Sequence, residues 1–140
     1  MSQKIGILPL ARPTFDGSYA EEQLPDVLDI LKQTGNKIVG SFELLMDEET
    51  ARASLEDLRP QNIDHLLVLQ LTFTDASIVV QAGQKLQCPL SIWSIPEPRS
   101  GKRLRLNSFC GLNLASHALG LNERAFSWFY KDPTTTRVAE

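Results

Sequence analysis

The stretch that decides the fold is residues 63–71, Ile-Asp-His-Leu-Leu-Val-Leu-Gln-Leu, in which residues 66–69 form an unbroken apolar run. Successive side chains of a strand point to opposite faces, so such a run predicts a strand that is buried on both faces. Strands of this kind occupy the centre of parallel sheets, where helices cover both faces. We therefore place residues 63–71 at the centre of a parallel sheet.

Further strands are expected on either side of this one, and they alternate with amphipathic segments. The expected strands are 4–10, 37–42, 90–95 and 125–130. This alternation predicts an α/β fold. Right-handed crossovers leave few arrangements for five such units. The commonest is the three-layer flavodoxin-like (Rossmann-like) fold, with a five-stranded parallel sheet in the order 2-1-3-4-5.

Capping residues predict where the helices begin. Ser18 and Glu21 have the spacing of a capping box at the first helix, although Pro25 also allows a start nearer Leu24. The other expected helices are 48–58 after Asp47, 75–86 after Thr74, and 109–119 after Asn107 or Ser108.

The composition fits a single domain that does not bind polyanions. The chain has 140 residues, of which 42% are hydrophobic, and its 17 acidic and 14 basic residues leave a formal charge of -3. Without a block of like charges, we expect no nucleic-acid partner. We predict an amino-terminal α/β domain over 1–132. Residues 133–140 would begin an interdomain linker or a further element, which would make the chain a fragment.

The chain has the features of a cytoplasmic protein. Its amino terminus lacks the apolar core and cleavage site of a signal peptide, and no run approaches the ~20 apolar residues of a membrane span. Cys88 and Cys110 are far apart and form no CxxC pair. We therefore expect reduced thiols, a cytoplasmic location and no membrane partner.

The expected strand order also predicts where a ligand binds. In open α/β sheets, ligands bind beyond the carboxyl ends of the strands, at the point where the strand order reverses. That point lies between the first and third strands. The loops nearest to it are 11–18, 72–75 and 94–100.

The first of these loops carries Arg12, Thr14 and Asp16. A guanidinium, a hydroxyl and a carboxylate together provide the directed donors and acceptors that a polyol requires. We therefore predict that these three residues bind substrate. In the alternative, Asp16 and Gly17 only shape a turn, and Arg12 is a surface residue.

Trp93 and Glu97 are the candidate substrate-binding residues of the loop after the fourth strand. The Trp93 ring either stacks on a sugar or belongs to the core. Glu97 stands between two prolines that stiffen the loop, and it either contacts substrate or is a solvated charge at the rim. The helix start at 107–111 offers N–H groups to an oxyanion, as every helix start does, but no phosphate-binding loop accompanies it.

No catalytic set is present in this sequence. It contains neither an HExxH metal site nor a GxSxG nucleophile elbow, and its His, Asp and Glu residues are not clustered at ligand spacing. We predict no catalytic residue, no metal site and no cofactor in this chain. If the chain serves an enzyme, the chemistry lies elsewhere.

Two separated segments resemble one family. Residues 4–7, KIGI, followed by residues 12–17, RPTFDG, are similar to the start of L-fucose isomerases. The second segment runs from Ile92-Trp93 through residues 107–111, NSFCG, to residues 125–130, AFSWFY. The sequence of this second segment is more similar to a broader group of fucose/arabinose isomerase-like proteins.

The resemblance implies a larger, multidomain aldose–ketose isomerase that acts on a monosaccharide with a divalent metal, typically Mn²⁺. Its metal ligands would belong to downstream domains that this sequence lacks. The amino-terminal domain would lie at a subunit interface in a homo-oligomer, a hexamer by analogy, and would lend residues to a neighbouring active site. Arg12 would then contact substrate and Trp93 would line the sugar pocket. Which sugar is bound remains open.

Two other functions fit the same pattern. The chain is then either a flavodoxin-like module that binds a phosphorylated or nucleotide ligand, or a non-catalytic assembly module whose exposed apolar faces pack against other domains or subunits.

Overall fold

The computed structural model describes residues 2–99, 101 and 103–134. Its sheet has five parallel strands in the order β2-β1-β3-β4-β5, which confirms the predicted α/β class and strand order. The strands are β1 (Lys4–Leu10), β2 (Lys37–Gly40), β3 (His65–Gln70), β4 (Leu90–Ser94) and β5 (Ser127–Tyr130). The helices are α1 (Gly17–Gln33), α2 (Glu48–Leu58), α3 (Ser77–Lys85) and α4 (Ser108–Leu121), with a short 3-10 helix at Arg59–Gln61.

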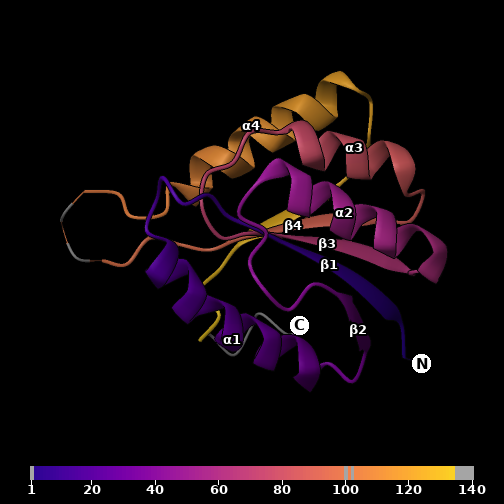
Figure 1. Ribbon diagram of the computed structural model, residues 1–140, viewed down its shortest axis with the longest axis horizontal. Coiled ribbons are helices and arrows are strands. Elements are labelled where there is room, and N and C mark those ends of the chain that lie inside the picture. The colour runs from indigo at the N-terminus through magenta and orange to yellow at the C-terminus, as the bar shows by residue number, and fades with distance from the viewer. Residues whose placement is uncertain (1, 100, 102, 135–140) are drawn as a thin grey trace.

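Helices cover both faces of the sheet, as Figure 1 shows, with α1 on one face and α2, α3 and α4 on the other. Strand β3 supplies both cores because its side chains alternate between them. Leu66 and Val68 pack toward α2, α3 and α4, whereas Leu67 and Leu69 pack toward α1. The sequence 63–71 is therefore a central strand, as its apolar run predicts.

Helix α1 begins earlier than the sequence pattern suggests. The predicted cap, Ser18, is wrong, because Ser18 lies within the first turn and Asp16 is the N-cap residue. The Asp16 carboxylate accepts a hydrogen bond from the N–H of Tyr19 at 2.9 Å. The helix then continues through Pro25, which is exposed and cannot donate a backbone hydrogen bond to the preceding turn.

Helix α3 begins differently from expectation, whereas α4 begins after Asn107, one of its two predicted caps. Thr74 does not cap α3, which starts at Ser77 without a side-chain cap. Instead, the Thr74 hydroxyl accepts a hydrogen bond from Gln70 Nε2 at 2.9 Å. At α4 the N-cap residue is Asn107, in the left-handed region at φ 53°, and its side chain makes no capping hydrogen bond. In contrast, α2 and its Asp47 cap are as predicted.

Strand β2 ends at Gly40, two residues before the expected boundary. Gly40 has φ 115°, and a Cβ at this position would lie 2.5 Å from the backbone oxygen of Ile7 on the neighbouring strand. Only glycine fits such a close approach. The chain therefore leaves the sheet at this residue.

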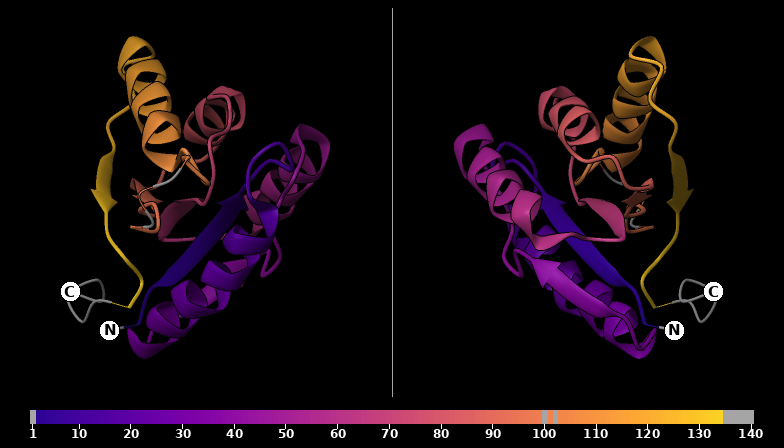
Figure 2. Two further views of the ribbon diagram at one scale, coloured as in Figure 1. Left: turned by 90° about the vertical axis from the view of Figure 1, so that its left-hand side faces the viewer. Right: turned by 90° about the vertical axis from the view of Figure 1, so that its right-hand side faces the viewer.

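Strand β5 forms one edge of the sheet, as both views in Figure 2 show. The predicted linker over 133–140 lies outside the described residues except for 133 and 134. Among the helices of the described residues, none is long and apolar enough to cross a membrane.

Candidate functional site

The predicted loops meet at the carboxyl edge of the sheet, where backbone hydrogen bonds join them. The N–H of Arg12 donates to the hydroxyl of Thr72 at 2.9 Å, which ties the β1 loop to the β3 loop. The N–H of Phe73 donates to the carbonyl of Leu106 at 2.8 Å, and this bond ties the β3 loop to the segment before α4. The loops therefore form one continuous rim above β1, β3 and β4.

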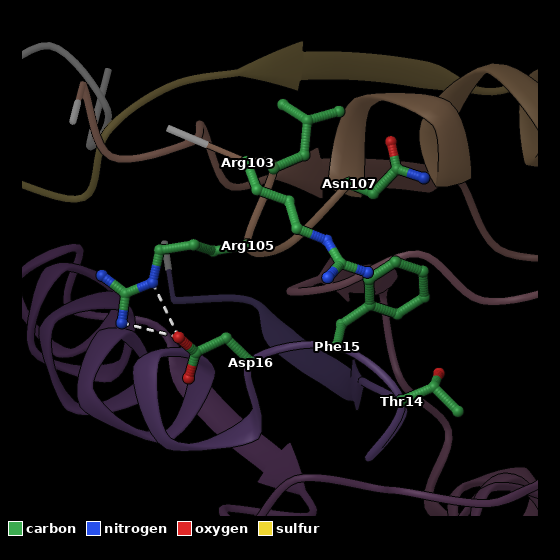
Figure 3. Close-up of a pocket in the computed structure, with 7 residues that line it drawn as sticks. Thr14, Phe15, Asp16, Arg103, Arg105 and Asn107 are labelled. Carbon is green, nitrogen blue, oxygen red and sulfur yellow. Dashed lines mark hydrogen bonds and ion pairs between the residues drawn. The ribbon is translucent and has the colours of Figure 1, made fainter. Parts of the chain in front are cut away.

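A pocket of about 570 Å³ opens between the β1 loop and the segment before α4 (Figure 3). Its wall combines charged, polar and apolar side chains. The residues that line it are Thr14, Phe15, Asp16, Arg103, Leu104, Arg105 and Asn107. Two of the predicted substrate-binding residues, Thr14 and Asp16, belong to this wall.

Asp16 is held on two sides within the wall. One carboxylate oxygen accepts from Tyr19, and the other pairs with Arg105 at 2.6 Å from Nη2 and 2.7 Å from Nε. The hydrogen bond from the Tyr19 N–H, together with the hydrogen bond and charge of Arg105, holds the pKa of Asp16 below its ordinary value. Asp16 therefore joins the start of α1 to a segment 89 residues away.

The Asp16–Arg105 pair predicts an acid-sensitive contribution to stability. Because the folded-state pKa of Asp16 lies below the unfolded value, the carboxylate stabilises the fold above about pH 4, and this contribution is lost as the pH falls through the folded-state pKa. Asp16→Asn keeps a good cap but removes the charge. We expect this variant to lose less stability than the parent chain between about pH 6 and pH 3 in urea unfolding.

Asp26→Asn is the matched control, since Asp26 is exposed on the same helix and no ion pair is seen for it among the described residues. It should follow the pH dependence of the parent chain. If Asp16→Asn also followed the parent chain at low pH, the pair would contribute nothing to the fold.

Arg105 was not among the predicted site residues, yet it organises this wall. Besides pairing with Asp16, its guanidinium lies 4.3 Å from the centroid of the Tyr19 ring. Burial, and then the charge of Asp132, raise the pKa of Tyr19, so the phenol stays neutral beneath the cation. The available sequence signal was the group of basic residues in the polar segment after the fourth strand, including Arg99, Arg103 and Arg105.

Glu97 holds the backbone of the segment that carries Arg103 and Arg105. Its carboxylate accepts backbone hydrogen bonds from Arg105 at 2.7 Å, Leu106 at 2.8 Å and Asn107 at 2.6 Å. Three N–H donors on one carboxylate make a compact anion-binding turn. In this structure Glu97 thus fixes the shape of the pocket wall from behind, and it is not one of the residues that line the pocket.

Trp93 lies beneath the site rather than on its surface. Its side chain is fully buried, its Nε1 donates to the carbonyl of Lys131 at 2.9 Å, and its ring centroid lies 5.3 Å from that of Phe129. This is the core arrangement, the second of the alternatives for this residue. Trp93 supports the end of β4 and ties it to the segment after β5.

Arg12 lies outside the pocket wall in this structure. Its side chain is partly buried, and its Nη1 donates to the carbonyl of Ala11 at 2.8 Å. Arg12 therefore occupies the same rim as Thr14 without sharing the pocket.

Gln70 is a buried polar residue at this edge that the sequence analysis did not single out. Its Nε2 donates to the carbonyl of Thr72 at 2.7 Å and to the hydroxyl of Thr74. The start of α4 packs closely on it, since a Cβ on Gly111 would lie 2.9 Å from Gln70 Nε2. Gln70 therefore shapes the β3 loop from inside the fold.

The described part of the chain contains no group of three or more His, Cys, Asp or Glu side chains that could hold a metal ion. At the rim, Asp16, Arg105 and Glu97 are engaged in an ion pair or in backbone hydrogen bonds. Arg99 and Arg103 are exposed, and no described residue pairs with either of them. The geometry therefore provides a polar wall at the carboxyl edge of the sheet.

One family model and several known proteins match almost the whole chain. The family model described as "Fucose/sulfoquinovose isomerase, N-terminal domain" matches residues 6–140. The sulfoquinovose isomerase of Priestia aryabhattai is 28% identical over 133 residues, and that of Alkalicoccus urumqiensis is 31% identical over 140 residues. Each alignment covers 95% of this chain and 30% of the relative, so the chain spans less than a third of the relatives' length.

Among solved structures, the lac repressor dimer bound to operator and the anti-inducer ONPF is similar, with a TM-score of 0.50 and 12% identity. The match covers 94% of this chain and 56% of that chain. At this level of identity the likeness concerns the fold alone.

Proposed function

Because the chain belongs to the fucose/sulfoquinovose isomerase N-terminal domain family, we propose that it is the pocket-lining and interface domain of an aldose–ketose isomerase. The observation that carries this proposal is the match over residues 6–140, which corresponds to only 30% of the length of the relatives. The resemblance in the KIGI and RPTFDG segments supports the same assignment. The chemical step would then be performed by residues outside this chain.

The rim at the carboxyl edge supports a role in substrate binding. Arg12 and Thr14 would contact hydroxyl groups of a monosaccharide, since their side chains offer directed donors on exposed or partly exposed positions. Asp16 and Glu97 would orient the wall through the bonds described above, and Trp93 would hold β4 in place beneath it. The names of the relatives provide one candidate substrate, sulfoquinovose, a sugar that carries a sulfonate.

A metal ion would be held by another part of the parent protein. The described residues do not fit a metal site, because no three ligand side chains gather among them. A divalent ion such as Mn²⁺, bound by downstream domains, would polarise oxygen atoms of the sugar. The residues of this chain would position the sugar and limit the access of water.

Turnover by a longer protein that includes this chain tests the proposed function. We expect aldose–ketose conversion by the longer protein with Mn²⁺ and none by the 140-residue chain. Sulfoquinovose and L-fucose should be offered separately, since the family name includes both sugars. Robust conversion by the isolated chain would contradict the assignment, because the chemistry would then lie within it.

Exposed apolar side chains support the interface role. On α4, Phe109, Leu114 and Leu121 are 45%, 39% and 73% exposed, and on the edge strand β5, Trp128 is 56% exposed. The Phe109 ring also packs edge-on against the Tyr130 ring, with 5.1 Å between the ring centroids. This contact joins the start of α4 to β5. Apolar and aromatic surface of this kind is typical of a protein interface. We propose that this edge packs against other subunits or domains of the assembly.

Replacing the two most exposed of these residues tests the interface. We expect the double variant Leu121→Ser, Trp128→Ser to raise the dissociation constant for self-association of the chain at least about 10-fold, since buried Trp side chains dominate interface energies. Sedimentation equilibrium measures this constant.

Phe42→Ser is the matched control, because Phe42 is 52% exposed in the loop that follows β2, at the other edge of the sheet. This control should associate like the parent chain. A parent chain that is strictly monomeric at high concentration would speak against a subunit interface at this edge.

A further inference from the structure

A groove with an apolar floor lies beside α1 at the β2 edge of the sheet (Figure 1). Two cavities, of about 420 Å³ and about 200 Å³, form it, and both are lined by Leu28 and Phe42. Its floor includes side chains that are only partly buried, Leu28, Ile38, Leu44 and Met46. Phe42, in the wall, is 52% exposed. The groove therefore presents apolar surface that no described part of the chain covers.

The residues of α1 that line the groove are spaced for helix packing. They are Glu21, Leu24, Pro25, Leu28 and Lys32. Positions three and four apart lie on one face of a helix, and such a face packs against a second helix by fitting ridges into grooves. From the first to the last of these residues, the face is about 16 Å long, or about three turns. The groove therefore has the spacing and the length for a short helix.

The charges around the groove are unevenly arranged. Glu21 and Glu43 line the larger cavity, whereas Lys32 lines the smaller one. All three side chains are exposed, and none of them forms an ion pair with a described residue. Because opposite charges on facing surfaces orient a partner, the larger cavity favours a basic side chain and the smaller one an acidic side chain.

A second copy of this chain fits the groove less well than a basic helix does. Helix α1 has four acidic residues and one basic residue, so two α1 helices packed side by side would repel each other. The exposed apolar helix α4 contains neither Lys nor Arg, and it offers no cation to Glu21 and Glu43. The relatives, in contrast, extend far beyond this chain, which corresponds to 30% of their length. The rest of such a parent protein is the better source of a basic helix.

From this arrangement we propose that the groove holds an amphipathic helix of about three turns that belongs to the rest of the parent protein. The apolar face of this helix covers Leu28 and Phe42. A Lys or Arg side chain at one end pairs with Glu21 and Glu43, and an acidic side chain at the other end lies near Lys32. The inference rests on the proposed function only in that the chain is part of a longer protein. It goes further by assigning a second interface, at the β2 edge, and the chemistry of its partner.

Carboxylate labelling of the longer protein and of the 140-residue chain tests which segment covers the groove. A carbodiimide with glycine ethyl ester should modify Glu21 and Glu43 at least about 5-fold more slowly in the longer protein, because the partner helix excludes water from them. Glu22 is the matched control, since it is exposed on α1 but lines neither cavity. It should react alike in both proteins. Mass spectrometry of proteolytic fragments locates the modified residues.

Charge reversal tests whether the partner is basic. In the longer protein, Glu43→Lys should raise the labelling rate of Glu21 at least about 3-fold, because a cation of the partner would then face a like charge. Glu22→Lys makes the same change of charge outside the groove, and it should leave Glu21 protected. Added salt should weaken the protection of Glu21 in the unsubstituted longer protein.

The 140-residue chain alone tests the chemistry of the groove. A helical peptide of about 14 Leu and Lys residues should shift the amide signals of residues 24–46 of the ¹⁵N-labelled chain, whereas the peptide with Glu in place of Lys should not. Phe42→Ser should raise the dissociation constant of the Lys peptide at least about 5-fold. Phe109→Ser is the matched control, since Phe109 is 45% exposed on α4, and it should change this constant less than about 2-fold.

Several outcomes would overturn the inference. These are equal labelling of Glu21 and Glu43 in the two proteins, protection that Glu43→Lys leaves unchanged, or equal shifts with the two peptides. Protection of Glu21 in the 140-residue chain at high concentration would assign the groove to a second copy instead. Because none of these readouts is turnover, each result would leave the isomerase assignment standing. Absence of turnover by the longer protein would in turn leave the labelling result unaffected.

Discussion

Replacement of Trp93 by alanine is expected to lower the free energy of unfolding by about 3–5 kcal/mol, the usual cost of truncating a buried Trp. The residue is 0% exposed, and its ring lies against Phe129. The variant also loses the hydrogen bond from Nε1 to the carbonyl of Lys131. Urea unfolding followed by circular dichroism measures the loss.

Two further variants separate packing from the hydrogen bond. Trp93→Phe keeps much of the buried ring but removes the bond to Lys131, so a smaller loss of about 1–3 kcal/mol is expected. Trp128→Ala is the matched control, because that ring is 56% exposed and its truncation should cost less than about 1 kcal/mol. If Trp93→Ala unfolded like the parent chain but lost sugar binding, Trp93 would be a stacking residue and not a core residue.

The fold was predictable because its strongest signals are local. The apolar run at 66–69 marks a strand buried on both faces, and a parallel sheet places such a strand at its centre. The handedness of crossovers left a few strand orders, and the commonest of these is the one observed. The same reasoning brings the loops after β1 and β3 together at the carboxyl edge, because that edge depends on the order of strands and not on any particular side chain. That a ligand binds there stays a prediction.

The roles of single residues at this rim were less predictable, because they depend on distant contacts. Asp16 and Ser18 are both good caps and stand two positions apart, and the choice between them involves Arg105, which is 89 residues from Asp16. Trp93 belongs to β4, which is buried on both faces. In such a strand the alternation of side chains does not tell whether the Trp93 ring belongs to the core or contacts a ligand. Periodicity could not indicate a sugar. That expectation came from the resemblance.

Loss of the Glu97 charge is expected to have the second large effect on stability. Glu97→Gln leaves one oxygen acceptor for three backbone donors and places an amide group against an N–H. Because hydrogen bonds to a charged group contribute about 1.5–3 kcal/mol, we expect a loss of about 2–3 kcal/mol. Glu22→Gln is the matched control, since Glu22 is exposed on α1, and it should change the free energy of unfolding by less than about 0.5 kcal/mol.

Hydrogen exchange distinguishes a local from a global effect of Glu97→Gln. The amides of residues 105–107 should exchange much faster in the variant, while those of β3 should change only as far as global stability does. Unchanged exchange at 105–107 would mean that the carboxylate does not hold this segment. Because the same segment carries Arg103 and Asn107 into the pocket, which Glu97 itself does not line, the variant should also weaken sugar binding. Glu97 would thereby act on the ligand through the backbone it holds, which separates a positioning role from direct contact.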